Sequence, residues 1–100
     1  MSYLDKIIEK LKSQYPYLFA EFGIKQIGIF GSIARQTENN ESDIDLVIEF
    51  YRPIGLKFMS LADYMEKLFD RKVDIITKEG IRHIRVKKVS KDIEKDIIYV

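Results

Sequence analysis

The sequence predicts an α+β fold, in which a small three-stranded sheet, mixed or antiparallel, carries helices packed on one side. Two patterns support this class. Apolar residues recur at helical spacing in residues 4–15 and 58–69, whereas they form short β-branched runs at 24–30, 43–50 and 72–77. Because the two kinds of segment alternate along the chain, each helix can bury its apolar face against the sheet.

Length and composition indicate one globular domain over residues 1–100. The chain is 46% hydrophobic and 33% charged, which excludes a disordered polypeptide. It has no cysteine, so disulfide scaffolds, thiolate zinc sites and cysteine nucleophiles are excluded. A net charge of +1 gives no overall attraction to nucleic acid or membrane. With no apolar run of membrane-spanning length and no signal-peptide pattern, we expect a cytoplasmic protein without membrane association.

The first helix is expected to begin after Ser2, because Ser2 and Asp5 have the spacing of a capping box. Its apolar residues fall on one face at the helical period of 3.6 residues. The helix is expected to end near Pro16 or to continue to about Phe22, where Gly23 is a natural stop.

The later elements follow from the same patterns and from the turn residues between them. The expected strands are 24–30, 43–50 and 72–77; helical turns are expected from 33, over 58–69, around 81–84 and after Ser90; loops are expected at 36–42 and 51–56. In strand 43–50 the apolar residues at even positions share one face and the acids the other. We expect the acidic face to stay open.

Asp43 and Asp45 are the first candidate site residues. Two residues apart on a strand, they project from the same face, with Cβ atoms about 6–7 Å apart. Carboxylates this close repel each other, and a divalent cation such as Mg²⁺ removes the repulsion. The alternative is that Asp-Ile-Asp is only the solvated face of a half-buried strand.

Asp74 strengthens the metal hypothesis. It lies in the middle of an apolar strand, where an acid is unfavourable unless it is paired or metal-bound. If this strand neighbours the strand of Asp45, three carboxylates converge, and two metal ions held between carboxylates are a common device for displacement at phosphorus. The alternative is a salt bridge from Asp74 to Arg71 or Lys72.

Gly31 and Ser32 follow directly after the strand 24–30. Glycine permits a tight turn and a close approach of other groups to the backbone, and exposed N–H groups at such a turn attract phosphate. The Ser32 hydroxyl adds a donor. The alternative is an ordinary strand-to-helix turn in which Ser32 caps the helix.

Two short segments together resemble the signature of the DNA polymerase β-like nucleotidyltransferase superfamily: they are Gly31-Ser32-Ile33-Ala34-Arg35 and Ser42-Asp43-Ile44-Asp45-Leu46. Since no further domain is present, the chain is most similar to the minimal nucleotidyltransferases, the MNT proteins of HEPN–MNT toxin–antitoxin pairs. The resemblance extends from about Ile24 to the end of the chain. It implies the nucleotidyltransferase fold.

The resemblance also implies roles for these residues. Gly31 and Ser32 would hold the nucleoside triphosphate, and Asp43 and Asp45 would bind two Mg²⁺ ions. Asp74 would complete the metal site and help to activate the acceptor hydroxyl. Proteins of this kind transfer AMP from ATP to a tyrosine of the partner HEPN toxin and thereby silence it.

Two neighbouring residues at the end of the first motif differ in how closely they follow its pattern. Arg35 matches the motif arginine, and its role is open between phosphate contact and structural pairing with an acid. Gln36 stands where many relatives have glycine, which affects the expected conformation of the following loop.

Other readings compete with the enzyme. The basic segment from Arg82 to Lys91 could bind nucleic acid, although no aromatic residues interleave, or an acidic partner, or only water. A catalytically silent antitoxin acting by contact is a further alternative, against which the three acids argue. Four phenylalanines are expected on the inner faces of helices: Phe19, Phe22, Phe58 and Phe69. Four tyrosines are expected to be exposed, and a patch of them would indicate a partner site: Tyr15, Tyr17, Tyr51 and Tyr64.

Overall fold

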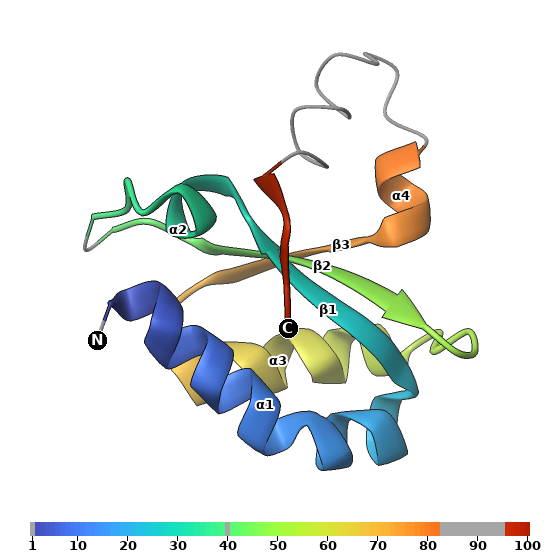
Figure 1. Cartoon of the computed structure of the whole chain (residues 1–100). Helices are drawn as coiled ribbons and strands as arrows, with labels where there is room; N and C mark the ends of the chain where they lie inside the picture. The colour runs from blue at the N-terminus through green and yellow to red at the C-terminus, as the bar shows by residue number, and fades with distance from the viewer. Residues whose placement is uncertain (1, 40, 83–95) are drawn as a thin grey trace.

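The structure is a computed structural model that describes residues 2–39, 41–82 and 96–100. Helices and strands alternate as the sequence predicts, and one additional strand closes the chain (Figure 1). The elements are α1 (Tyr3–Phe22), β1 (Ile24–Phe30), α2 (Gly31–Arg35), β2 (Ile44–Phe50), α3 (Lys57–Phe69), β3 (Val73–Thr77), α4 (Lys78–Arg82) and β4 (Ile98–Tyr99).

The sheet is mixed, which confirms the predicted fold class. Its strand order is β3-β2-β1-β4. β1 is antiparallel to both β2 and β4, whereas β2 and β3 are parallel. The described strands number four instead of the expected three, because β4 pairs with β1 through residues 98 and 99. The helix expected after Ser90 lies almost entirely outside the described residues.

The first helix has both of the ends that its sequence predicts. Ser2 accepts a hydrogen bond from the Asp5 backbone N–H, and Asp5 accepts one from the Ser2 backbone N–H. The helix continues through Pro16 to Phe22. Gly23 then adopts a left-handed conformation (φ 67°), and its N–H donates to the Phe19 carbonyl at 2.9 Å.

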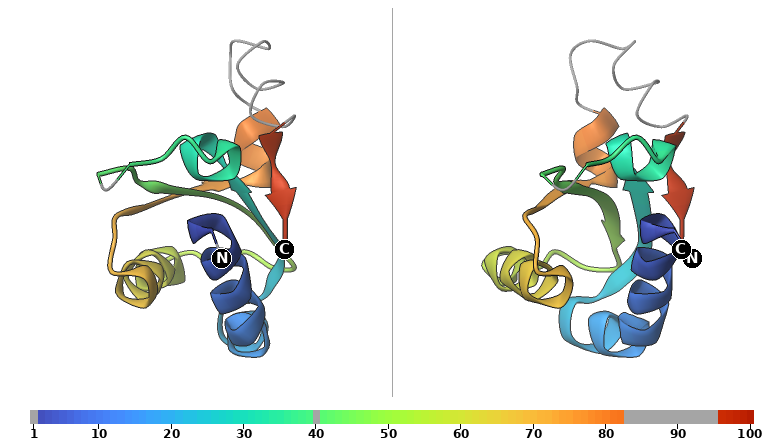
Figure 2. Two further views of the ribbon diagram at one scale, coloured as in Figure 1. Left: turned by 60° about the vertical axis from the view of Figure 1, so that its left-hand side comes forward. Right: turned by 90° about the vertical axis from the view of Figure 1, so that its left-hand side faces the viewer.

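The core lies between one face of the sheet and the two long helices. Figure 2 shows α1 and α3 on the same side of the sheet, as expected. The first three even-numbered residues of β2 point into this layer and are fully buried, as are apolar residues from both helices: Ile44, Leu46, Ile48, Ile7, Leu11, Leu18, Leu61 and Met65. Burial of these side chains is the main stabilising contribution to the fold. Among the described helices, none is long and apolar enough to cross a membrane.

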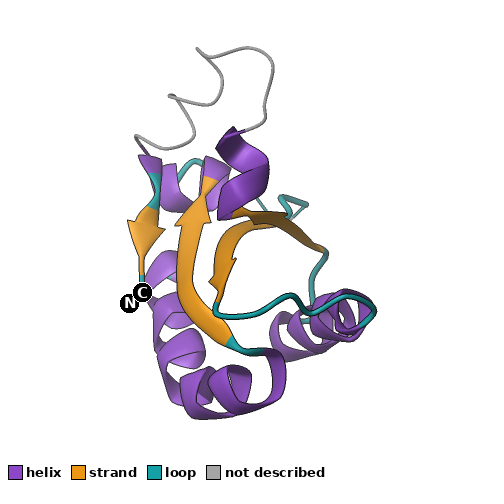
Figure 3. Ribbon diagram, turned by 90° about the vertical axis from the view of Figure 1, so that its right-hand side faces the viewer, coloured by secondary structure: helices purple, strands orange, loops and turns teal. Residues whose placement is uncertain are grey.

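The opposite face of the sheet is only partly open, so the expectation of an open acidic face is wrong for its central row. The short helix α4 lies on this side (Figure 3). Val47 and Ile81 are 2% and 1% exposed. A Cβ atom on Gly28 would collide with Val47 and Ile97, so glycine makes room for their side chains. The physical reason is that strand alternation places Val47 between the acids, where it needs cover.

Candidate active site

Gly31 brings the backbone into contact with an acidic side chain. β1 ends at Phe30, and Gly31 has φ 73°, in the left-handed region that glycine tolerates best. A Cβ atom at this position would overlap Oδ2 of Asp45. The predicted tight turn and close approach are therefore present, and the group that approaches is the Asp45 carboxylate.

The sheet register gathers the remaining candidates at the same end. Parallel pairing of β2 with β3 places Asp45 directly opposite Asp74, and antiparallel pairing with β1 places Phe30 opposite Asp45. The strands of Asp45 and Asp74 are thus neighbours, as the hypothesis of converging carboxylates requires. Asp43 precedes β2 by one residue.

The pKa of Asp45 reflects the charged groups around it. Its partial burial raises the pKa of the Asp45 carboxyl, the Asp74 and Asp43 carboxylates raise that pKa further, and the Arg35 guanidinium opposes them. Asp45 is therefore the group on which the charges of all the other acidic and basic candidates act.

The neighbouring cations Arg71 and Lys72 do not form the salt bridge with Asp74 that the alternative interpretation requires. Lys72 Nζ lies 3.9 Å from Oδ2 of Asp43 instead. The Arg71 guanidinium lies over the Tyr3 ring, at 4.6 Å from its centroid, and donates to the Ser42 carbonyl at 3.2 Å. Within the part of the chain that the structure describes, no ion pair joins Asp74 to either residue, so the salt-bridge alternative for Asp74 is wrong.

Ser32 is not a helix cap. The capping position of α2 is occupied by Phe30, and no side chain provides a capping hydrogen bond. The Ser32 hydroxyl makes no hydrogen bond to the residues of the described ranges, whereas its carbonyl accepts from the Thr37 N–H at 2.9 Å. The hydroxyl is consequently free for an external group.

Arg35 forms an ion pair that the sequence did not predict. Its Nη1 lies 3.4 Å from Oδ2 of Asp96, a residue just before β4. This contact realises one of the two roles left open for Arg35, the structural pairing with an acid; contact with phosphate stays a prediction. Gln36 follows the last residue of α2 with φ 59°, a left-handed conformation in which glycine is usually favoured.

The acids offer the oxygen ligands that Mg²⁺ prefers. No three acidic or histidine side chains among the described residues are already arranged as a metal cluster. The donor chemistry nevertheless fits, because Asp45 lies directly opposite Asp74 and two residues from Asp43, and a cation between these carboxylates would relieve their repulsion. Asp43, Asp45 and Asp74 are the residues that would hold Mg²⁺.

Other predicted features lie away from this end. Phe22 and Phe69 are buried, as expected, but Phe19 is 46% exposed, so its expected place on an inner face is wrong. Tyr17 and Tyr51 are exposed, as expected, whereas Tyr15 and Tyr64 are partly buried against the core, so their expected exposure is wrong. Residues 83–91 of the basic segment lie outside the described residues.

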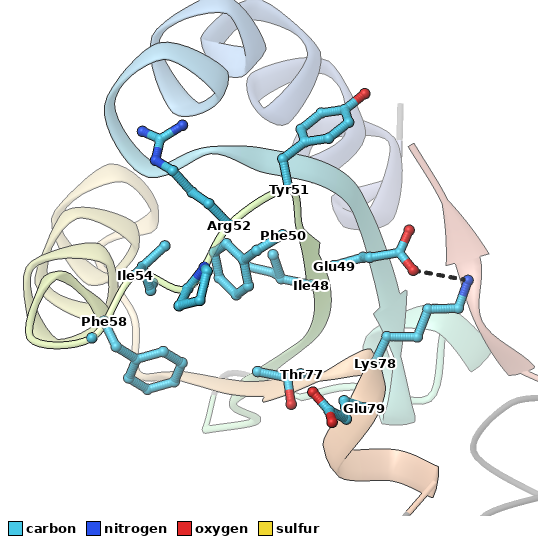
Figure 4. Close-up of a pocket in the computed structure, with 12 residues that line it drawn as sticks. Ile48, Glu49, Phe50, Tyr51, Arg52, Ile54, Phe58, Thr77, Lys78 and Glu79 are labelled. Atoms are coloured by element: carbon cyan, nitrogen blue, oxygen red, sulfur yellow. Dashed lines mark ion pairs between the residues drawn. The ribbon is translucent and has the colours of Figure 1, made fainter.

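A pocket of about 560 Å³ lies at the opposite end of β2 and was not predicted. It is lined by the last residues of β2, the loop after it and the start of α3 and α4 (Figure 4). Its single sequence signal is the apolar Pro- and Gly-containing loop at 51–56.

Comparison with known proteins identifies the class. The sequence model of the nucleotidyltransferase domain matches residues 4–100, so this chain belongs to the nucleotidyltransferase domain family. Membership makes it a nucleotidyltransferase. A Methanocaldococcus jannaschii protein whose assigned name is protein adenylyltransferase is 42% identical over 101 residues, covering 100% of both chains. Protein adenylyltransferase MntA of Thermococcus cleftensis is 31% identical, covering 97% of this chain and 95% of its own.

Solved structures share the fold. One described as a minimal nucleotidyltransferase has a TM-score of 0.73 at 24% identity and covers 98% of this chain and 95% of its own. A toxin–antitoxin structure with AMP-PNP has a TM-score of 0.63 at 20% identity and covers 97% of this chain and 71% of its own. These likenesses confirm the predicted nucleotidyltransferase fold.

Proposed function

We propose that this protein is an Mg²⁺-dependent adenylyltransferase that transfers AMP from ATP to a tyrosine hydroxyl of a partner HEPN toxin, and that it acts as the antitoxin in the cytoplasm. The observation that carries the proposal is the position of Asp45. Its carboxylate contacts Gly31, and its backbone lies directly opposite Asp74 on the neighbouring strand. This arrangement places acidic ligands beside a backbone turn at which a triphosphate can bind.

The relatives favour a protein as the acceptor. Two proteins that match nearly the whole chain, at 42% and 31% identity, are named protein adenylyltransferases. A structural neighbour is a toxin–antitoxin complex with an ATP analogue, which is consistent with ATP as the AMP donor.

Each site residue then has a role in transfer. Gly31 and the free Ser32 hydroxyl bind the triphosphate, and Asp43, Asp45 and Asp74 hold Mg²⁺. Bound Mg²⁺ supplies charge stabilisation to the triphosphate. Asp74, the most exposed of the three acids, takes the proton from the acceptor hydroxyl. The acceptor oxygen bonds to the α-phosphorus, the bond from that phosphorus to the bridging oxygen breaks, and pyrophosphate leaves.

Arg35 has a supporting position. It lies close enough to lower the pKa of Asp45, and it is held by Asp96 at 3.4 Å. We propose that Arg35 contacts a phosphate once the nucleotide binds.

The test is label transfer. The protein is incubated with host lysate, Mg²⁺ and ATP labelled at the α-phosphate, in parallel with ATP labelled at the γ-phosphate. The Asp45→Asn variant tests the acid, and Glu49→Gln is the matched control, because Glu49 lies on the same face of β2 but pairs with Lys25 and Lys78.

We expect an α-labelled protein band that needs Asp45 and not Glu49. Label in nucleic acid would contradict a protein acceptor and favour an RNA-modifying enzyme. No label in any fraction, with the partner expressed, would favour an antitoxin that acts by contact alone.

A further inference from the structure

The exposed large apolar side chains gather at the end of the molecule remote from the acids. Among the described residues six such side chains are exposed, and only Tyr99 lies outside the second half of α1, the loop after β2 and the first turn of α3. We define the distal surface by four of them together with the adjoining pocket: Phe19, Tyr51, Leu56 and Met59. Leu56 is 91% and Met59 73% exposed, which is unusual for side chains of this size.

Side-chain contacts tie these elements into one surface. The Phe19 and Tyr51 rings lie edge to face with centroids 5.4 Å apart. Lys57 Nζ, at the start of α3, lies 3.5 Å from Oε1 of Glu21 in α1. Arg52 Nη2 donates to the Ala20 carbonyl at 3.5 Å. The loop after β2 is thereby fixed against both helices, so little ordering is needed when a partner binds.

The pocket in this surface is apolar between two charged ends. Phe50, Ile54 and Phe58 surround the opening, with Arg52 at one side of it and Glu79 at the other (Figure 4). Within the described residues neither Arg52 nor Glu79 has an ion-pair partner. Glu49 and Lys78, by contrast, form an ion pair with each other at 3.8 Å. The complementary ligand is an apolar ridge flanked by an acid, which meets Arg52, and a base, which meets Glu79.

We infer that the distal surface docks the protein acceptor of AMP, an inference that rests on the proposed function. The distal surface contains tyrosine, methionine and arginine, which are residue types enriched in protein interfaces. Asp45 and Phe50 are five residues apart on β2, which is roughly 17 Å of strand. A folded partner with the diameter of a small domain, about 30 Å, covers both ends at once, whereas a short peptide bound at the acids does not.

Docking and chemistry can be separated with two forms of the acceptor. One is the purified protein that takes the α-phosphate label, and the other is a short synthetic peptide around its labelled residue. The docking variant combines Leu56→Ser with Met59→Gln. Leu56 is 91% exposed, so serine there removes no buried contact, and glutamine keeps the helix propensity of methionine, so the fold should persist. The control is Tyr99→Thr, which removes an exposed apolar side chain outside the distal surface.

We expect the docking variant to raise KM for the intact acceptor roughly tenfold or more, with KM for ATP and the rate on the peptide unchanged. Arg52→Glu should raise the same KM, and Tyr99→Thr should not. Unchanged KM for the intact acceptor, or an equal loss on the peptide, would overturn the docking surface while leaving the proposed function intact. A self-association of the wild type that Leu56→Ser abolishes would assign the surface to a second copy and overturn the inference. Failure of any protein to take label would overturn both proposals.

Discussion

Replacing Asp45 by asparagine should stabilise the metal-free protein while abolishing AMP transfer. The side chain keeps its size and its place beside Gly31, but it no longer carries a charge next to Asp74 and Asp43. Because burial and these two carboxylates raise the pKa of Asp45, the ionised form is the unfavourable one in the folded state. Removing that charge therefore removes a cost that only the folded protein bears.

The size of the effect follows from the register. Asp45 and Asp74 are direct partners on adjacent strands, which lie about 4.8 Å apart. Two charges about 5 Å apart repel by roughly 3 kcal/mol at an effective dielectric constant of 20 and by less than about 1 kcal/mol in bulk water. Asp74 is exposed and Asp45 only half-buried, so solvent screening brings the expected gain to about 1 kcal/mol. For a domain of this length that corresponds to an increase in Tm of roughly 4–8 °C.

The gain should depend on pH in a defined direction. A carboxyl whose pKa is raised in the folded state binds its proton more tightly there than in the unfolded chain. The free energy of unfolding of the wild type therefore falls as the pH rises from the ordinary value of 3.8 through the raised pKa. Below 3.8 both states are protonated and the cost disappears. The variant lacks this dependence, so the two proteins should differ most at neutral pH.

Urea unfolding in EDTA, at neutral pH and close to the ordinary carboxyl pKa, measures this difference. Mg²⁺ should then stabilise the wild type more than Asp45→Asn. Glu49→Gln is the control, because Glu49 faces Lys25 and Lys78 at 3.6 and 3.8 Å and its neutralisation should not stabilise. A lower free energy of unfolding for Asp45→Asn at neutral pH without metal would refute the argument, as would undiminished transfer by that variant.

Three further substitutions test the turn between β1 and the loop that follows α2. Ser32→Ala should weaken binding of a non-hydrolysable ATP analogue by about tenfold, measured by calorimetry, with Tm nearly unchanged, because the hydroxyl has no hydrogen bond within the described residues; unchanged affinity would contradict its role. Gly31→Ala should lower the free energy of unfolding by about 1–3 kcal/mol in urea and abolish transfer, because its φ is 73° and its Cβ would overlap Asp45. Gln36→Gly should instead raise the free energy of unfolding by about 0.5–1 kcal/mol, because Gln36 has φ 59°, which glycine adopts at lower cost. A lower free energy of unfolding would show that the glutamine side chain stabilises the fold by more than its backbone conformation costs.

The sequence predicted the parts of the fold that have a periodic pattern or a turn signal. Residues 24–30 are β1 as expected, and α1 ends at Phe22 before Gly23. The strand Ile98–Tyr99 has only two residues, too few for any alternation to be visible, and its pairing with β1 is a tertiary contact. The exposure of Phe19 was missed for a related reason: helical spacing gives the direction of a side chain and not what lies opposite, which here is Tyr51.

In the candidate site, too, some residues were predicted from the sequence and others are brought in only by the fold. The motif spacing indicated Gly31 and Asp45, and the strand register then made them contact each other. Asp96 could not be predicted, because a single acid in a charged tail has no pattern, and only the fold places it 3.4 Å from Arg35. The pocket at the far end of β2 likewise depends on how the loop after β2 lies against α1 and α3.

Like charges are brought together where transfer is proposed to take place. The carboxylates of Asp45, Asp74 and Asp43 lie beside the turn that carries α2, and Gln36 follows that turn with φ 59°, although Asp70 at the end of α3 is also left-handed. The core beneath them has no such conflict, since its buried side chains are apolar and none of the described buried polar atoms lacks a hydrogen bond. Carboxylates that repel one another are favoured at a site where a bound ligand relieves the repulsion. A cation between the acids and a triphosphate on the turn would provide that relief, so binding and stability should rise together in this protein.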